Sequence, residues 1–177
     1  ASTESEDLWS SCLEAMKVAV SEVAHPKRIR SIAVASVGEA AVPLDGKGEP
    51  LYPVIAWYDA RTADQVKWLE KKIGKQRLFE ITGLYPYPFF GVCKQMWIRD
   101  HEPEVFSKIR SWLNTADFLA WKLCGIPATD FSLASRTFAL NIHTLKYEED
   151  LLRELGIPRE WYQDLVPSGS ALGAVLP

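Results

Sequence analysis

Helical spacing of apolar residues opens the chain. Between residues 5 and 23, apolar side chains recur every three or four positions, which predicts an amphipathic helix with one buried face. His25 and Pro26 end it, because the residue before a proline avoids helical backbone. The first element is therefore predicted to be a surface helix that covers part of a core.

Shorter apolar runs follow and predict strands. Residues 31–36 are apolar and rich in small and β-branched side chains, which indicates a buried strand. Two further strands are predicted over 41–44 and 54–57, with a turn over 45–48 after the first of them. A glycine-containing turn between two such runs favours a hairpin.

The rest of the chain is predicted to be mainly helical. One exception is the stretch 84–91, which is rich in proline and aromatic residues and predicts a loop whose rings pack on the body or line a cavity. Asp130 is predicted to cap a helical turn over 130–135, and 111–113 is a candidate strand. Helices are predicted over 62–72, 76–81, 92–99, from Pro103, and over 115–123, 146–155 and 158–165.

Composition narrows the function classes. The 177 residues are 47% hydrophobic and 24% charged, with a net charge of −3, which is typical of a soluble domain and disfavours nucleic-acid binding. The three cysteines are widely spaced and the three histidines scattered, so neither a disulfide framework nor a metal cluster is predicted. There is no apolar run of membrane length and no signal-peptide pattern, and a cytoplasmic location is the expectation.

Candidate chemistry lies at the ends of two predicted strands. Glu39 follows the run 31–36, and Trp57 ends the run 54–57. A carboxylate accepts hydrogen bonds from hydroxyl groups, and an indole ring stacks on the C–H face of a sugar or polyol. Gly38 has no Cβ and so permits a ligand to approach the backbone. The pattern therefore indicates a site for a small polyhydroxylated molecule.

Two other functions use the same residues. A non-catalytic carbohydrate-binding module would present Trp57 with Phe89 and Phe90 to a sugar. A glycosidase would pair Glu39 with Asp59 or Asp45, because glycoside hydrolysis needs two carboxyl groups about 5–10 Å apart. Hydrolysis of an aryl glycoside would separate the glycosidase from the binding module.

The order of motifs along nearly the whole chain resembles the FGGY carbohydrate kinases, the relatives of glycerol kinase, xylulokinase and gluconate kinase. The motifs are Ser36-Val-Gly-Glu39, Val54-Ile-Ala-Trp-Tyr-Asp-Ala-Arg61, Thr82-Gly83, Lys94-Gln-Met-Trp-Ile98, His101-Glu-Pro-Glu104, Asp117-Phe-Leu, Asp130-Phe-Ser-Leu-Ala-Ser135, Leu155-Gly-Ile-Pro158 and Pro167-Ser-Gly-Ser-Ala-Leu-Gly173.

The resemblance implies an α/β fold of the ribonuclease H-like (actin-like ATPase) class, incomplete and with helical additions. It implies that residues 1–177 are part of an N-terminal kinase domain, without the opening strands and their phosphate loop and without the C-terminal domain. The expected activity is transfer of the ATP γ-phosphoryl group to a hydroxyl of a sugar or polyol, with Mg²⁺ as cofactor. The expected partners are a small-molecule sugar or polyol and the remainder of the same kinase, and a homodimer is a further candidate assembly.

The resemblance also assigns roles to residues. Glu39 stands where glycerol kinases hold substrate hydroxyls with a glutamate, and Trp57 matches a tryptophan that packs on the substrate. Gly38 replaces the Arg or Met found before that glutamate, so one substrate contact is absent or is supplied elsewhere. Phe89 falls about where glycerol kinases place a tyrosine, which removes a hydroxyl that would serve glycerol.

No catalytic residue is expected in this chain, because the resemblance puts the general-base aspartate in the C-terminal domain. The isolated chain is therefore expected to be inactive. Asp117 and Asp130 stand at helix starts and are predicted to be caps rather than bases. Asp59 and Arg61 are predicted to form a structural ion pair. The departures at Gly38 and Phe89 leave trioses, tetritols, pentuloses and hexonates open as substrates.

Overall fold

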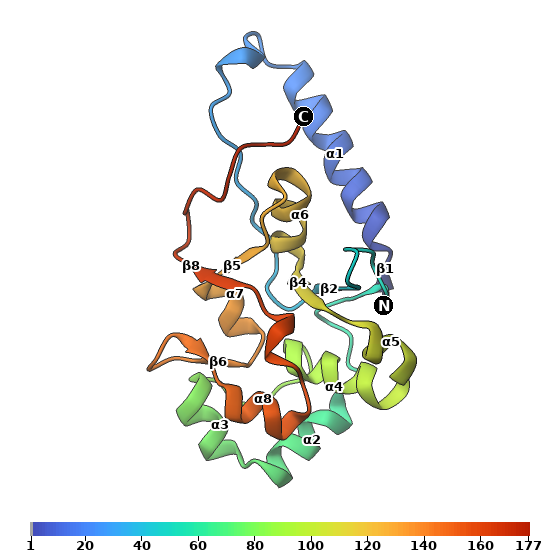
Figure 1. Ribbon diagram of the computed structural model, residues 1–177, viewed down its shortest axis with the longest axis vertical. Helices are drawn as coiled ribbons and strands as arrows, with labels where there is room; N and C mark the ends of the chain where they lie inside the picture. The colour runs from blue at the N-terminus through green and yellow to red at the C-terminus, as the bar shows by residue number, and fades with distance from the viewer. Residues whose placement is uncertain (1) are drawn as a thin grey trace.

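The computed structural model describes residues 2–177, with side chains from residue 4 onward. Short strands are interspersed with helices along the chain (Figure 1). The helices are α1 (Ser5–Ser21), α2 (Ala63–Lys72), α3 (Lys75–Thr82), α4 (Gly91–His101), α5 (Pro103–Lys108), α6 (Thr115–Cys124), α7 (Phe131–Arg136) and α8 (Glu149–Leu155), with 3₁₀ turns at Pro26–Arg28 and Arg159–Trp161. The strands are β1 (Ser2–Thr3), β2 (Ala41–Leu44), β3 (Val54–Ile55), β4 (Ser111–Asn114), β5 (Ala128–Asp130), β6 (Leu140–Asn141), β7 (Lys146–Tyr147) and β8 (Asp164–Val166).

Strand pairing differs from the predicted hairpin. β2 pairs antiparallel with β4, and β3 pairs antiparallel with β1. The chain does turn back after β2, since the amide of Asp45 donates to the Glu49 carbonyl, but the ladder ends at a single bridge between Leu44 and Pro50. Pro50 and Pro53 lack amide donors and cannot continue it. The hairpin prediction is therefore wrong beyond the turn itself.

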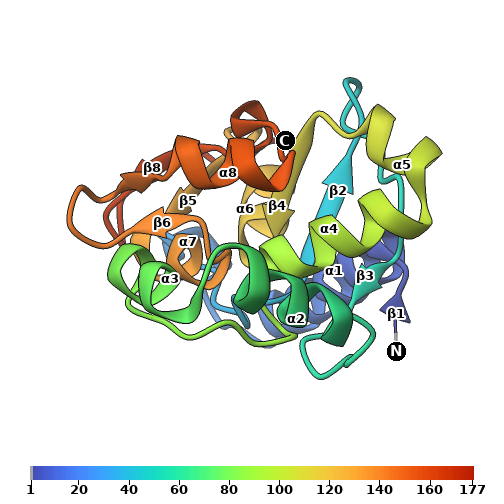
Figure 2. The same cartoon turned by 90° about the horizontal axis from the view of Figure 1, so that it is seen from below.

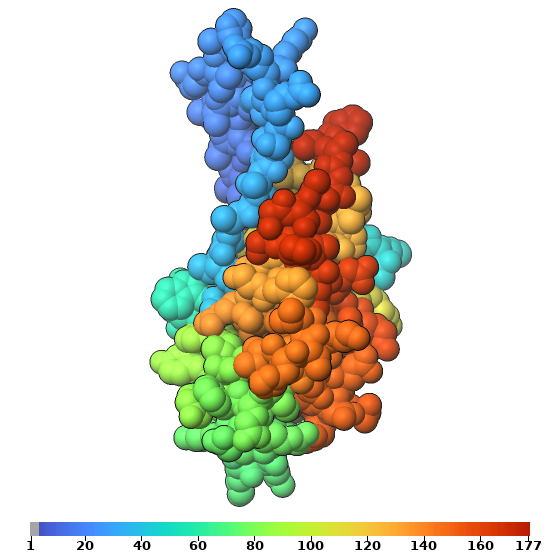
Figure 3. All heavy atoms as spheres, turned by 90° about the vertical axis from the view of Figure 1, so that its left-hand side faces the viewer, coloured from blue at the N-terminus to red at the C-terminus, as the bar shows by residue number. Residues whose placement is uncertain are grey.

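The predicted strand over 31–36 is also wrong. The segment is extended but mostly exposed, and no strand among the described residues pairs with it. α1 is helical as predicted, and the start of its expected buried face packs on a core cluster through Leu8, Trp9 and Cys12. Further along, the same face is open, with Val20 42% exposed. Figures 1 and 3 show α1 and the following segment projecting from the rest of the molecule. The apolar pattern fixes which face is suited to burial, but burial itself requires a surface that covers that face.

Near the C-terminus the structure replaces predicted helix by strand. The helix predicted over 146–155 starts only at Glu149, because residues 146–147 form β7, which pairs with β6. The helix predicted over 158–165 is a 3₁₀ turn followed by β8, which pairs in parallel with β5. Short runs suit either element, and here the partner strand decides, a nearby one for β7 and a distant one for β8.

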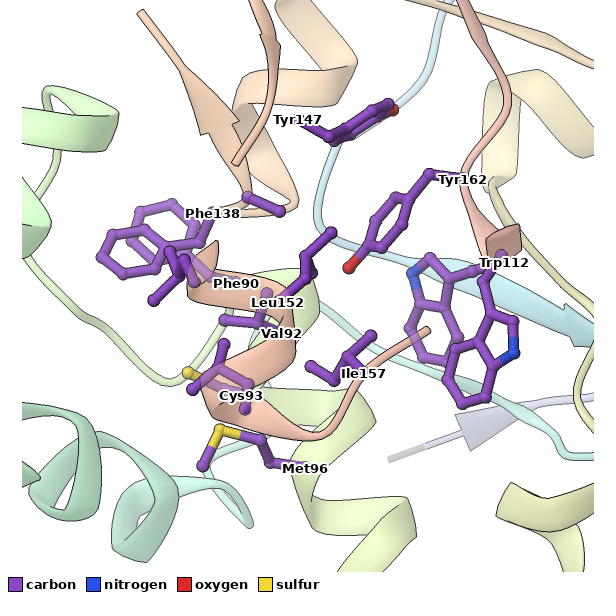
Figure 4. Close-up of a cluster of buried hydrophobic side chains, with 14 of the residues drawn as sticks. Phe90, Val92, Cys93, Met96, Trp112, Phe138, Tyr147, Leu152, Ile157 and Tyr162 are labelled. Atoms are coloured by element: carbon purple, nitrogen blue, oxygen red, sulfur yellow. The ribbon is translucent and has the colours of Figure 1, made fainter. Parts of the chain in front are cut away.

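The main core lies between the helices of the lower half of the molecule, which Figure 2 shows end-on. Phe90 stacks on Phe138 with ring centroids 4.8 Å apart (Figure 4), and the Tyr162 hydroxyl donates to Gln95 at 2.6 Å. Cys93 is fully buried there, as predicted for a small core residue, and burial raises the pKa of its thiol to about 12. This core fixes the loop 84–91, which connects α3 to α4 and carries Phe89.

The remaining predictions for the helices hold. α2, α3, α4 and α6 begin and end within two residues of the predicted bounds, and α5 begins at Pro103 as predicted. Asp130 caps α7, since its carboxylate accepts from the Leu133 amide at 2.8 Å. Within the described residues, no helix combines the length and the apolar character that crossing a membrane requires.

Candidate functional site

Glu39 lies in the turn before β2 and faces the end of α7. The Nε of Arg136 donates to its Oε1 at 2.6 Å. The side chains are 16% exposed for Glu39 and 30% for Arg136, so the pair lies at the rim of the core, where solvent reaches it. This ion pair joins two segments that are 97 residues apart in the sequence.

Aromatic rings hold the other side of the guanidinium. The Cζ of Arg136 lies 4.9 Å from the ring centroid of Phe90 and 5.4 Å from that of Phe89. Such stacking on ring faces is favourable for arginine and restricts its rotation. Phe89 is therefore brought next to Glu39 through Arg136, a residue for which the sequence analysis proposed no role.

Gly38 leaves room for the same arginine. A Cβ at this position would stand 2.5 Å from the Cγ of Arg136 and 2.8 Å from its Cβ. The Cβ of Arg136 cannot move away without moving α7, and its Cγ can move away only if the side chain changes rotamer. The close approach that Gly38 allows in this structure is thus an approach by a protein side chain.

Trp57 lies on the surface after β3. Its ring is packed edge-on against Tyr58 at 5.5 Å, and the residue is 50% exposed. Its loop is tied to the loop of Phe89, because the Thr62 hydroxyl donates to the Pro88 carbonyl at 2.5 Å. Among the ring contacts of the described residues, none joins Trp57 to Phe89. An exposed indole on an anchored loop is available to stack on a ligand.

Lys94 holds the Glu39 turn and the end of β3 together from the core side. It is 1% exposed, and its ammonium donates to the Ile55 carbonyl at 3.0 Å and to the carbonyl of Glu39. Burial lowers the pKa of Lys94 to about 8. One side chain of α4 therefore connects the Glu39 turn to the strand that leads into Trp57. The sequence signal is a lysine among apolar helix positions, since Val92, Cys93, Met96 and Ile98 are also buried.

The predicted pairing of Asp59 with Arg61 is confirmed. Arg61 donates from Nε at 3.0 Å and from Nη2 at 2.9 Å to the two carboxylate oxygens of Asp59. This contact holds the pKa of Asp59 far below its usual range. Asp45 accepts from the amides of its own turn, which also lowers its pKa. The acid of a glycosidase pair needs a raised pKa, so neither residue suits that role in the paired-carboxylate hypothesis.

Asp117 differs from its prediction. It is 5% exposed and does not cap α6; its carboxylate accepts from the Asn114 side chain at 2.9 Å. Burial raises the pKa of Asp117 to about 6, although hydrogen bonds from Thr129 and Asn114 act in the opposite direction. It therefore serves as a buried link between β4, β5 and α6.

Asp117→Asn is expected to stabilise the fold at neutral pH. Because the folded-state pKa of about 6 lies above the unfolded value, the stabilisation from the protonated carboxyl is complete below about pH 4 and is lost as pH rises through 6. We expect the variant to gain about 1–3 kcal/mol in unfolding free energy at pH 7.5 and little at pH 4. Denaturant titrations between pH 4 and about 7.5 measure this gain in unfolding free energy, with the exposed Asp150→Asn variant as control. A pH profile equal to that of the wild type would contradict the assignment.

The family of the chain is shown by comparison with known families. Residues 1–177 match the FGGY family of carbohydrate kinases, N-terminal domain. The chain belongs to this family.

The similar curated proteins are sugar and polyol kinases. A glycerol kinase of Saccharolobus islandicus (strain L.S.2.15 / Lassen #1) is 34% identical over 175 residues, which cover 95% of this chain and 34% of that protein. The L-fuculokinase of Escherichia coli (strain K12) is 31% identical over 147 residues, which cover 83% of this chain and 31% of that protein. The chain thus spans about a third of the length of the curated relatives it matches.

Solved structures show the same fold. Gluconate kinase from Lactobacillus acidophilus superposes with a TM-score of 0.89 at 21% identity, over 99% of this chain and 35% of that one. Plasmodium falciparum glycerol kinase with ADP gives a TM-score of 0.86 at 24% identity, over 99% of this chain and 37% of that one. The fold is therefore part of the ribonuclease H-like, actin-like ATPase class, as the resemblance implied.

Proposed function

We propose that residues 1–177 form part of the N-terminal domain of an ATP-dependent sugar or polyol kinase and supply its substrate-positioning side. The observation that carries the proposal is the solvent-reached carboxylate of Glu39, held in place by Arg136 and flanked by Phe89. Only Oε1 of Glu39 receives the arginine Nε, so Oε2 can accept from a substrate hydroxyl. Trp57 provides an exposed ring on the neighbouring loop.

Positioning is a substantial part of phosphoryl transfer. The reaction needs the acceptor hydroxyl in line with the γ-phosphorus, and good orientation can contribute about 7–11 kcal/mol to lowering the barrier. Lys94 supports this positioning, because its hydrogen bonds fix the backbone of Glu39 relative to that of Ile55, the last residue of the strand before Trp57. A rigid support of this kind is what keeps a hydroxyl-binding carboxylate in one place.

ATP and Mg²⁺ are proposed for the whole kinase. Within the described residues, no group of three or more His, Cys, Asp or Glu side chains is arranged to hold a metal ion. The residues present therefore do not fit a metal site of their own, and we assign no step through the metal or the nucleotide to this chain. The Plasmodium relative was solved with ADP, which supports a nucleotide donor for the family. The cytoplasmic location and the homodimer stay predictions.

The test is an ATP-consumption assay on the full-length protein that carries this chain, with glycerol, D-xylulose, L-fuculose and D-gluconate as acceptors. We expect turnover with at least one acceptor, and no turnover by residues 1–177 alone. Binding of an acceptor without any ATP turnover by the full-length protein would favour the carbohydrate-binding module instead. Turnover by the 177-residue chain would contradict the proposal that this chain supplies only the substrate-positioning side of the site.

A further inference from the structure

The guanidinium of Arg136 has N–H donors that are not used within the described residues. Its Nε is bonded to Glu39, and among the contacts of the described residues neither terminal nitrogen has a hydrogen-bond acceptor. The group is 30% exposed and is held flat against Phe89 and Phe90. An arginine that is fixed by one ion pair and two rings, with N–H groups still open, is prepared to bind a ligand.

Donor and acceptor lie side by side in this pair. Glu39 offers an open carboxylate oxygen, and Arg136 offers open N–H groups within one ion-pair distance of it. A hydroxyl group both donates and accepts hydrogen bonds, so two neighbouring hydroxyls can bridge such a pair with every bond satisfied. We propose that Arg136 is a specificity-determining residue of the site and that, with Glu39, it selects a neutral polyol or sugar through two adjacent hydroxyl groups. This rests on the proposed function.

A sugar acid fits the pair less well. Its carboxylate would compete with Glu39 for the same guanidinium and would stand near a like charge, which is unfavourable. The ammonium of Lys94 adds positive charge nearby, but it is buried on the core side and donates to two backbone carbonyls. The Arg61 guanidinium is paired with Asp59. The charges that face the substrate are therefore those of Glu39 and Arg136.

Gly38 provides a second way to disturb the arginine. Because a Cβ there would stand 2.5 Å from the Cγ of Arg136, Gly38→Ala shifts the guanidinium while keeping its charge. Arg136→Met removes the donors but keeps much of the stem, and Arg136→Lys keeps the charge and restores only part of the donor set. Together these variants distinguish the effect of moving the Arg136 guanidinium from the effect of removing it.

The experiment measures kcat and KM of the full-length protein with glycerol, D-xylulose, L-fuculose, D-gluconate and ATP. We expect the best acceptor to be neutral. For it we expect Arg136→Met to lower kcat/KM by about 10–100-fold, Gly38→Ala to lower it in the same direction, and Arg136→Lys to recover part of the loss, all with the KM for ATP unchanged. The exposed Arg153→Met, which loses only a surface pair with Asp150, serves as the matched control and should leave all values unchanged.

Other outcomes overturn the inference in distinguishable ways. No turnover of any acceptor by the wild-type protein would reject the proposed function itself, and the role of Arg136 with it. Turnover by the wild type with unchanged kinetics in Arg136→Met would reject the role of Arg136 alone. D-gluconate as the best acceptor, lost in Arg136→Met, would show that the arginine selects an acid instead of a diol. A merely structural arginine would lower the melting temperature of the variants and leave acceptor KM as in the wild type.

Discussion

Glu39→Gln in the full-length kinase is expected to lower kcat/KM for the acceptor by about 10²–10³-fold and to leave ATP binding unchanged. A glutamine accepts hydrogen bonds more weakly than a carboxylate and ends the ion pair with Arg136, so it loses both the substrate contact and the alignment of the guanidinium. The backbone of the turn should stay in place, because Lys94 donates to the Glu39 carbonyl and not to its side chain. The expected loss is therefore local to the acceptor.

Steady-state kinetics in acceptor and ATP, with calorimetric titration of ATP, measure this effect. Glu49→Gln is the matched control, since it makes the same change at an exposed position beyond the β2 turn. Unchanged acceptor kcat and KM in Glu39→Gln would remove Glu39 from the site. A parallel loss of ATP affinity would point to a general disturbance of the domain rather than to a substrate contact.

Local features of the fold were predictable from the sequence. The period of apolar residues predicts helices such as α2, Gly125 ends α6 with left-handed backbone, and the Asp130 cap of α7 depends on contacts within three residues. Pairing was not predictable in this way. β2 pairs with β4 and β5 pairs with β8 across long segments that contain several helices and strands, and nothing within a short window of sequence specifies those partners.

The two errors of burial have one cause. The period of α1 and the apolar run 31–36 were recognised correctly, yet the C-terminal part of α1 and the run 31–36 lie largely exposed in the structure, because burial depends on a covering surface that the pattern does not contain. Asp117 shows the converse error. Its place in the first turn of α6 favoured a cap, whereas the side chains of Asn114 and Thr129 make it a buried hydrogen-bond acceptor.

The site was only half visible in the sequence. Glu39, Trp57, Gly38 and Phe89 were chosen from residue chemistry and from the family resemblance, and the structure brings three of them around one arginine. Arg136 itself directly follows the motif that ends at Ser135, and its contact with Glu39 spans 97 residues. A glycine where relatives carry a long side chain was the available hint, because such a gap has to be filled from elsewhere.

Lys94→Ala should have the largest effect on stability, lowering the free energy of unfolding by about 3–5 kcal/mol and the melting temperature by roughly 6–20 °C. The change removes a buried stem and leaves the carbonyls of Glu39 and Ile55 without their donor. Lys94→Met keeps the stem volume. It should lose only about 1–3 kcal/mol, because two unpaired carbonyls are partly offset by no longer burying an ammonium whose pKa burial has lowered to about 8.

The same two variants, Lys94→Ala and Lys94→Met, distinguish the effect of the Lys94 ammonium on acceptor kinetics from the effect of its packing on stability. If the ammonium sets the distance between the Glu39 turn and the strand before Trp57, Lys94→Met should lower acceptor kcat/KM nearly as much as Lys94→Ala despite its smaller loss of stability. Thermal unfolding and acceptor kinetics of the full-length protein measure both, with Lys67→Ala, a 76% exposed side chain, as control. A methionine variant with wild-type kinetics would mean that the helix packing alone holds Glu39, and the two hydrogen bonds of Lys94 would then contribute to stability without positioning the substrate.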